Sequence, residues 1–151
     1  LSERYALDPA RARTLTEELG DLDAYRILVA EDSPLIRKQL QNVLSQGGFN
    51  NVVLVGDGKD AWDRLSETPD GYSLLVTDVE MPRLDGLALT RRVKENAAMK
   101  SIPIVVFSSI MAKDIKIKAA SVGAEAQITK PEINDLVSHV CRLLREHPKS
   151  A

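Results

Sequence analysis

Three carboxylic acids, a serine and a lysine follow short apolar runs in this 151-residue chain. Glu31 and Asp32 follow the first run, Asp78 follows a later one, and Ser108 and Lys130 follow the last two. Carboxylates share a small pocket only if a cation or a proton compensates their charge. Mg²⁺, a hard cation that prefers oxygen ligands, suits such a cluster. The pattern therefore predicts a magnesium site formed by Glu31, Asp32 and Asp78.

The same residues could carry out phosphoryl transfer. A carboxylate flanked by Mg²⁺ and an ammonium group can attack phosphorus and become an acyl phosphate. Asp78 is the predicted acceptor because it ends the apolar stretch LLVT at residues 74–77. Mg²⁺ and Lys130 would neutralise the equatorial phosphoryl oxygens, and Ser108 would donate a hydrogen bond to one of them.

Each of these residues also has an ordinary structural interpretation. Asp32 could cap the helix expected to begin near Ser33. Asp78 could be a turn residue, Ser108 a loop hydroxyl and Lys130 a solvated surface lysine. Together they favour a functional site, because oxygen ligands and a cation at four separate strand ends are improbable by chance.

The apolar runs alternate with segments of helical periodicity. The expected strands are 25–30, 51–55, 72–77, 102–107 and 124–129. The expected helices are 34–48, 58–67, 85–97, 112–123 and 132–147. This alternation predicts an α/β fold with a parallel sheet. In such open sheets the ligand site lies beyond the carboxyl ends of the strands, which is where the candidate residues fall.

A further helix is expected before the first strand. Asp8 would cap it, Pro9 would begin it and Gly20 would end it. We expect residues 1–24 to be a linker or docking element rather than core. Residues 25–147 would then form one domain, followed by a tail at 148–151.

Composition and charge exclude several classes of function. The 20 basic and 22 acidic residues give a net charge of −2, which argues against nucleic acid as a partner. No apolar run approaches the roughly 20 residues of a membrane span. The single cysteine, Cys141, excludes an internal disulfide framework. Because the N-terminus is also too charged for a secretory signal, we expect a cytoplasmic location.

The chain resembles the receiver domains of two-component response regulators over residues 25–147. The resemblance rests on four stretches in order: LVAEDS, VTDVEMPRLDG, VVFSS and ITKP. It implies a flavodoxin-like (βα)5 fold, a doubly wound parallel sheet with strand order 2-1-3-4-5. It also implies a signalling phosphoacceptor rather than an enzyme, one that catalyses only its own phosphotransfer and slow dephosphorylation.

The resemblance assigns roles to individual residues. Glu31 and Asp32 would form the acid pocket, and Asp78 would accept phosphate from a phosphohistidine on a histidine kinase. The backbone carbonyl of Glu80 would complete the Mg²⁺ shell. Ser108 would be the switch hydroxyl and Lys130 the phosphate-binding lysine, with a cis bond to the following proline, Pro131.

Three residues depart from the usual receiver pattern. Glu31 stands where receivers often have aspartate, which adds one methylene to the acid pair. Gln127 occupies the position of the usual switch aromatic on the fifth strand. Glu80 places an acid two residues after the acceptor, where side chains commonly tune dephosphorylation.

A finer resemblance is to the receiver of the CheV family of chemotaxis coupling proteins. It rests on AEDSPLIRKQL, TDVEMPRLDGLALT, FSSIM and VGAEAQITKPEINDLV. It implies the chemotaxis kinase as phosphoryl donor, and a CheW-like domain and a chemoreceptor complex as further partners. Residues 1–24 would then be the linker to the CheW-like domain.

Three other interpretations of the motifs differ in the residues that they require. A haloacid-dehalogenase-type phosphatase also forms an aspartyl phosphate, but that class requires Asp-x-Asp, and Asp78 is followed by Val79 and Glu80. Flavodoxin shares the fold, but the acidic stretch AEDSP would repel its phosphate. The third interpretation is a receiver-shaped interaction module that is not phosphorylated. The intact acceptor, lysine and hydroxyl argue against it, whereas Gln127 favours altered signalling.

Overall fold

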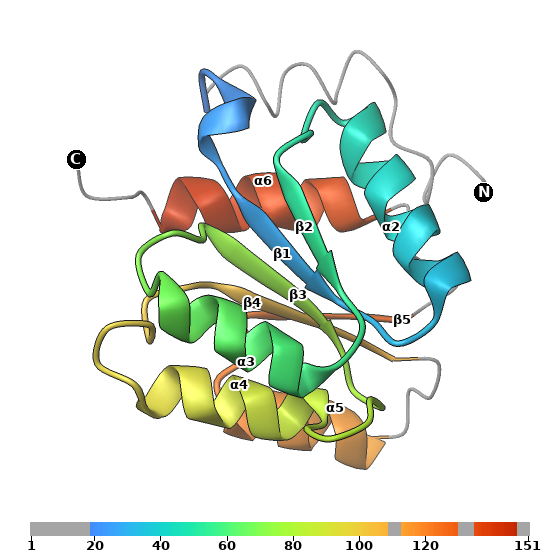
Figure 1. Ribbon diagram of the computed structural model, residues 1–151, viewed down its shortest axis with the longest axis vertical. Coiled ribbons are helices and arrows are strands. Elements are labelled where there is room, and N and C mark those ends of the chain that lie inside the picture. Colours follow the sequence, from blue (N-terminus) through green and yellow to red (C-terminus); the bar gives the residue numbers. More distant parts are fainter. Residues whose placement is uncertain (1–18, 109–112, 130–134, 148–151) are drawn as a thin grey trace.

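The computed structural model describes residues 19–108, 113–129 and 135–147 (Figure 1). Its strands form one parallel sheet in the order β2-β1-β3-β4-β5, which confirms the predicted flavodoxin-like order. The strands are β1 (Ile27–Ala30), β2 (Val52–Val55), β3 (Leu74–Asp78), β4 (Ile104–Ser108) and β5 (Ala126–Thr129). Strands β2 and β5 lie at the two edges of the sheet.

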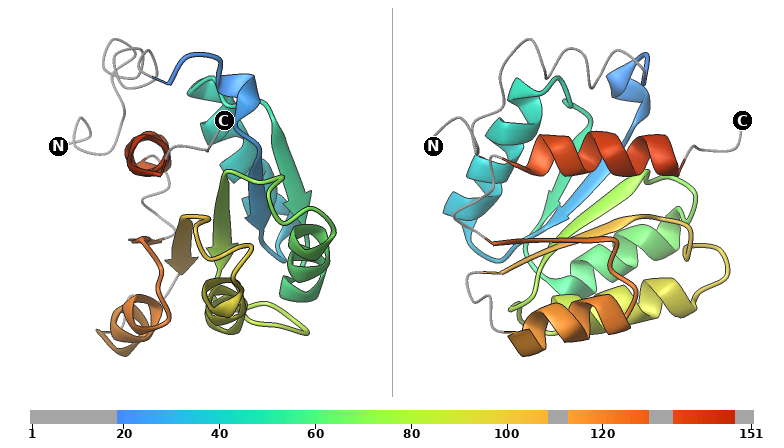
Figure 2. Two further views of the ribbon diagram at one scale, coloured as in Figure 1. Left: turned by 90° about the vertical axis from the view of Figure 1, so that its left-hand side faces the viewer. Right: turned by 180° about the vertical axis from the view of Figure 1, so that it is seen from behind.

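The helices form two layers, one on each face of the sheet (Figure 2). They are the short 3₁₀ helix η2 (Leu22–Ala24), α2 (Pro34–Gln46), α3 (Gly58–Glu67), α4 (Gly86–Glu95), α5 (Lys113–Ser121) and α6 (Leu136–Glu146). Helices α2 and α6 cover one face, and α3, α4 and α5 cover the other. Among the described residues, no helix combines the length and the apolar character that crossing a membrane would require.

The strands supply both layers of the core because successive side chains point to opposite faces. In β1, Ile27 and Val29 pack toward α2 and α6, whereas Leu28 and Ala30 pack toward α3 and α4. All four are fully buried, as expected for a parallel strand covered on both sides.

The free thiol of Cys141 lies in the core layer between the sheet and helices α2 and α6. Burial raises the pKa of this thiol to about 11, although Arg145 acts in the opposite direction.

Short polar side chains begin the helices next to the carboxyl edge of the sheet. The Ser33 hydroxyl accepts a hydrogen bond from the Ile36 amide and caps α2, with Pro34 in the first turn. Asp85 caps α4 by accepting from the Ala88 amide at 2.8 Å. Because Ser33 performs the capping, the alternative that Asp32 serves only as this cap is wrong.

The last residues before β1 lie against one layer of the core. Residues 1–18, which include most of the expected N-terminal helix, lie outside the described residues. Leu19 and Leu22 pack against the core layer of α2 and α6, and the Tyr25 hydroxyl donates to the Leu19 carbonyl at 3.0 Å. These two partly buried leucines therefore place the end of the expected linker or docking element against the core, and the role of residues 1–24 stays a prediction.

An ion pair holds α4 to the sheet at the edge opposite the candidate site. The Lys94 ammonium donates to the Glu125 carboxylate at 2.8 Å and to the carbonyls of Ile102 and Lys100 at 2.7 and 3.1 Å. The other Glu125 oxygen accepts from the Ile104 amide at 3.0 Å. The Lys94 and Glu125 side chains are only 17% and 19% exposed. Because water solvates them poorly, each charge is stabilised mainly by the other.

Lys94→Met should lower the free energy of unfolding by about 2 kcal/mol, because it leaves the partly buried Glu125 carboxylate without its cation. Denaturant titration checks this value. Lys59→Met is the matched control, since Lys59 pairs with Asp63 at 47% and 48% exposure. The control should change stability by no more than about 0.5 kcal/mol. Equal losses in the two variants would show that the Lys94 contact contributes no more than a surface pair.

Candidate functional site

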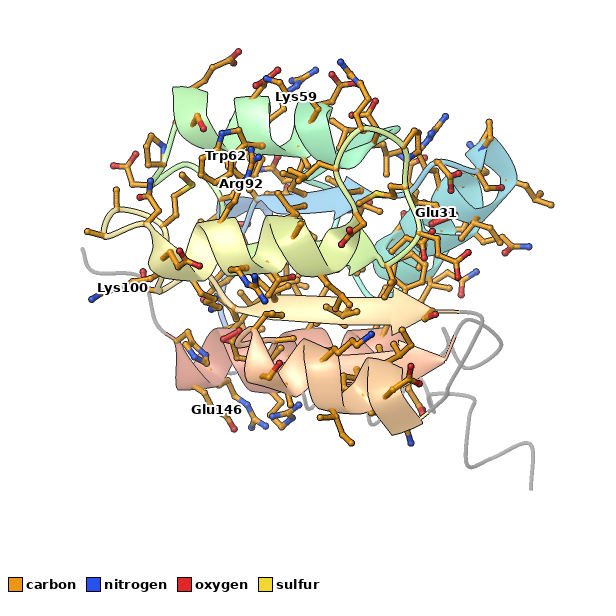
Figure 3. The ribbon with its side chains drawn as sticks, turned by 90° about the horizontal axis from the view of Figure 1, so that it is seen from below. Glu31, Lys59, Trp62, Arg92, Lys100 and Glu146 are labelled. Carbon is orange, nitrogen blue, oxygen red and sulfur yellow. The ribbon has the colours of Figure 1, made fainter. Side chains whose placement is uncertain are left out.

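The acids predicted from the sequence meet at the carboxyl edge of the sheet. Glu31 and Asp32 directly follow β1, and Asp78 is the last residue of β3, the strand beside it. Figure 3 shows Glu31 at the end to which the strands point and Lys100 at the opposite end. The parallel sheet thus brings together residues that are 46 positions apart in the sequence.

The backbone and side chain of Glu31 are held by the turn that follows β1. Its amide donates to the Val55 carbonyl at 3.1 Å, which continues the pairing with β2. The Ser33 amide donates to the Glu31 carboxylate at 3.3 Å. The Arg37 guanidinium of α2 donates to the Glu31 carbonyl at 2.7 Å. This fully buried carboxylate therefore has a defined position beside β3.

The backbone around Asp78 is fixed on both sides. The next amide, of Val79, donates to the Phe107 carbonyl at 3.2 Å, and the Gly86 amide donates to the Val79 carbonyl at 2.8 Å. A Cβ at Gly86 would lie 1.9 Å from the Asp78 carbonyl oxygen, so only glycine permits this approach. The Asp78 side chain is 2% exposed at the tip of its strand.

Carboxylate oxygens of Glu31, Asp32 and Asp78 all lie within 4.8 Å of one another. Two of these acids are buried and Asp32 is exposed, so the cluster opens to solvent on one side. Asp32, Glu80 and Asp85 line a hollow next to it, together with Val79. Close carboxylates with solvent access fit a hard divalent cation that keeps several waters.

The other predicted site residues are described in part. Ser108 ends β4 at the same edge of the sheet, and its side chain is 3% exposed. Glu80 lies in the loop after β3, where it lines the hollow next to the acids. Strand β5 ends at Thr129, directly before Lys130. Lys130, and with it the expected cis bond to Pro131, lies outside the described residues.

Gln127 on β5 contacts the helix that precedes its strand. Its side-chain amide donates to the Lys116 carbonyl of α5 at 2.8 Å. The position at which receivers usually have an aromatic ring therefore carries a side chain that is hydrogen-bonded to the helix backbone.

Sequence reasoning missed an arginine in the loop that joins β3 to α4. Arg83 forms ion pairs with Asp57 and Asp60 at the start of α3, at 2.8 and 2.9 Å. Burial opposes ionisation of Asp57, but the Asp60 amide and the Arg83 guanidinium outweigh it and lower the pKa of that carboxyl. No spacing rule relates residues 57 and 83, so the contact is visible only in the folded chain.

The chain matches a known protein family over most of its length. Residues 27–141 match the family described as the response regulator receiver domain. The chain belongs to this family. Receiver domains are signalling phosphoacceptors of two-component systems and not enzymes in the ordinary sense. The fold, the strand order and the acidic cluster at the carboxyl edge are those that the sequence resemblance implied.

Individual relatives agree with this assignment. The chain is 33% identical over 106 residues to the chemotaxis protein CheY1 of Helicobacter pylori, covering 70% of this chain and 85% of that protein. It is also 33% identical over 108 residues to the gliding motility regulatory protein of Myxococcus xanthus, covering 72% of this chain but only 14% of that protein.

A solved structure shows the same likeness in three dimensions. The signal receiver domain of a histidine kinase from Syntrophus aciditrophicus superposes with a TM-score of 0.76 at 32% identity. The match covers 85% of this chain and 96% of that domain. The receiver fold is therefore supported both by sequence and by structure.

Proposed function

We propose that this receiver domain accepts a phosphoryl group on Asp78 from a phosphohistidine of a histidine kinase, with Mg²⁺ bound in the acid cluster. The observation that carries the proposal is the convergence of three carboxylates within 4.8 Å, one of them at the tip of β3. Such a cluster has no evident structural use, since the neighbouring helices have caps of their own.

The chemistry assigns a separate part to each residue. A carboxylate oxygen of Asp78 attacks phosphorus and the P–N bond of the donor breaks. The histidine ring, already protonated on its other nitrogen, keeps the electron pair of that bond and leaves as neutral imidazole. Glu31, Asp32, Asp78 and the backbone carbonyl of Glu80 would hold the cation. When bound, Mg²⁺ supplies positive charge to the phosphoryl oxygens. Ser108 donates a hydrogen bond to one of these oxygens and Lys130 balances their charge.

A chemotaxis role is the more specific part of the proposal. The similarity to CheY1 over 85% of that protein supports a cytoplasmic chemotaxis kinase as donor. The CheV-like motifs further support a CheW-like domain and a chemoreceptor complex as partners. In that arrangement residues 1–24 are the linker, residues 25–147 the receiver and residues 148–151 a tail.

A receiver that binds partners without phosphorylation is the second candidate. The observation that favours it is at Gln127, the residue that replaces the usual switch aromatic. Its side chain donates a hydrogen bond to the Lys116 carbonyl. This candidate predicts that partner binding is unchanged by phosphoryl donors.

Magnesium titration of Asp32→Asn tests the proposed site. Calorimetry should show affinity reduced by about tenfold or more, because even residues that only support a metal ligand contribute that much. Asp63→Asn is the matched control: it removes an exposed acid whose ion pair is with Lys59 on the same helix. Unchanged Mg²⁺ affinity in Asp32→Asn would remove this residue from the metal site.

A further inference from the structure

The side chain of Arg83 links the loop at 79–85, between β3 and α4, to the neighbouring helix α3. The Arg83 guanidinium reaches across to the first turn of α3 and pairs with two carboxylates. Its Nε donates to an Asp57 oxygen at 2.9 Å, and its Nη2 lies 2.8 Å from the same oxygen. Nη2 also donates to Asp60 at 2.9 Å. One planar group thus connects two loops of the carboxyl edge.

Arg83 makes these contacts from an unfavourable backbone conformation. Its φ of +67° lies in the left-handed region, and it is the only non-glycine residue with positive φ among the described residues. Bulky side chains avoid this region, whereas glycine and asparagine adopt it readily. The guanidinium contacts therefore maintain a conformation that the arginine backbone disfavours.

A backbone contact joins the same two segments beside Arg83. A Cβ at Gly58, the first residue of α3, would lie 1.8 Å from the Leu84 carbonyl oxygen. At its base the loop is closed by the hydrogen bond from Gly86 to the Val79 carbonyl. The loop is thus held at its base by the Gly86–Val79 hydrogen bond. At its far end it is held by the Arg83 ion pairs and by the close packing of the Leu84 carbonyl against Gly58.

The held loop carries Glu80, whose carbonyl is the proposed fourth protein ligand of the cation. The geometry points to Arg83 as a positioning residue: by holding loop 79–85 against α3, it keeps the Glu80 carbonyl in place for the divalent cation beside Glu31, Asp32 and Asp78. This inference rests on the proposed function, because it concerns the same metal site.

An electrostatic role and a positioning role of Arg83 predict opposite changes in Mg²⁺ affinity when the residue is replaced. If only its charge mattered, removing a cation from the same edge of the sheet would strengthen Mg²⁺ binding slightly, since the remaining field is more negative. If the arginine positions a ligand, its removal weakens binding despite that change in field. The sign of the effect therefore separates the two explanations.

Calorimetric titration with MgCl₂ tests the inference on Arg83→Asn. Asparagine tolerates the left-handed backbone but has no charge to pair with Asp57 and Asp60. The variant should bind Mg²⁺ about tenfold more weakly, the lower end of the effect of residues that support a metal ligand. In the Asp60→Asn background, Arg83→Asn should cause a smaller loss, because one of its ion pairs is already absent.

Lys59→Asn is the matched control for charge. It removes one positive charge from the first turn of α3, but its partner is Asp63 on the same helix, and Lys59 lies on the outer side of α3 (Figure 3). This variant should bind Mg²⁺ as the parent does or slightly more tightly. Affinity in Arg83→Asn equal to or above that of the parent would overturn the inference.

Hydrogen exchange of the metal-free protein distinguishes a failure of this inference from a failure of the proposed function. The amides of Leu84 and Gly86 should exchange faster in Arg83→Asn, because both report the closed loop. A parent protein that binds no Mg²⁺ would overturn the metal site and the positioning role together. A parent that binds Mg²⁺, with neither exchange nor affinity altered in the variant, would overturn the role of Arg83 alone.

Discussion

Asp78→Asn should take up no phosphoryl group from acetyl phosphate under conditions in which the parent protein is labelled. The amide that replaces the carboxylate is a poor nucleophile, and it also removes one of the three acids that attract the cation. Because the two side chains have similar size and the position is buried at 2% exposure, the fold should persist. Intact-protein mass spectrometry measures the adduct, and circular dichroism checks the fold.

Asp85→Asn is the matched control for this prediction. Asp85 lies seven residues further along the chain and lines the same hollow, but its carboxylate caps α4 by accepting from the Ala88 amide. Asparagine is as good a cap as aspartate, so the variant should fold and be labelled like the parent. Labelling of Asp78→Asn at the parental level would place the acceptor elsewhere.

Gly86→Ala should destabilise the domain and displace the acceptor. The added methyl group would lie 1.9 Å from the Asp78 carbonyl oxygen and 2.8 Å from its carbon, so backbone must move on one side. Overpacking of this kind costs about 3 kcal/mol, the upper end of the usual range. In an ordinary first turn of a helix, alanine would instead stabilise by up to about 1 kcal/mol relative to glycine. Urea titration measures the change.

Gly56→Ala separates this close approach from a general effect of alanine. Its Cβ would meet only the end of the Arg37 side chain, at 3.1 Å, and that side chain can move. The free energy of unfolding should change by less than about 1 kcal/mol. Gly86→Ala with parental stability and parental labelling would show that the contact with Asp78 does not constrain the site.

The fold could be predicted from patterns that act locally. The stretch from Ser33 to Gly47 contains a capping hydroxyl, a proline in the first turn and a closing glycine, and α2 occupies that interval. The ends of other elements were less predictable. The expected strand at 25–30 begins at Ile27, and the expected helix at 85–97 ends at Glu95, because Asn96 adopts an extended conformation. Local composition does not indicate at which residue the backbone hydrogen bonds of a strand or a helix begin or end.

The acidic cluster could be predicted because strand order and strand ends determine it. Once β1 and β3 are parallel neighbours, the residues that follow them must meet. The side chains that position the loops could not be predicted. Arg83 contacts Asp57 across 26 residues, and Arg37 reaches back to the Glu31 carbonyl from one turn into α2. These contacts depend on loop conformations, including a positive φ, that no periodicity describes.

The proposed function requires that Asp78 carries a phosphoryl group when Mg²⁺ is present. The most direct measurement is the mass of the intact protein after incubation with acetyl phosphate, with Mg²⁺ and with a chelator, followed by borohydride reduction and peptide mapping. We expect one phosphoryl group with Mg²⁺, none with the chelator, and reduction of the acyl phosphate to homoserine at position 78. No adduct in the presence of Mg²⁺, or homoserine at any other acid, would contradict it.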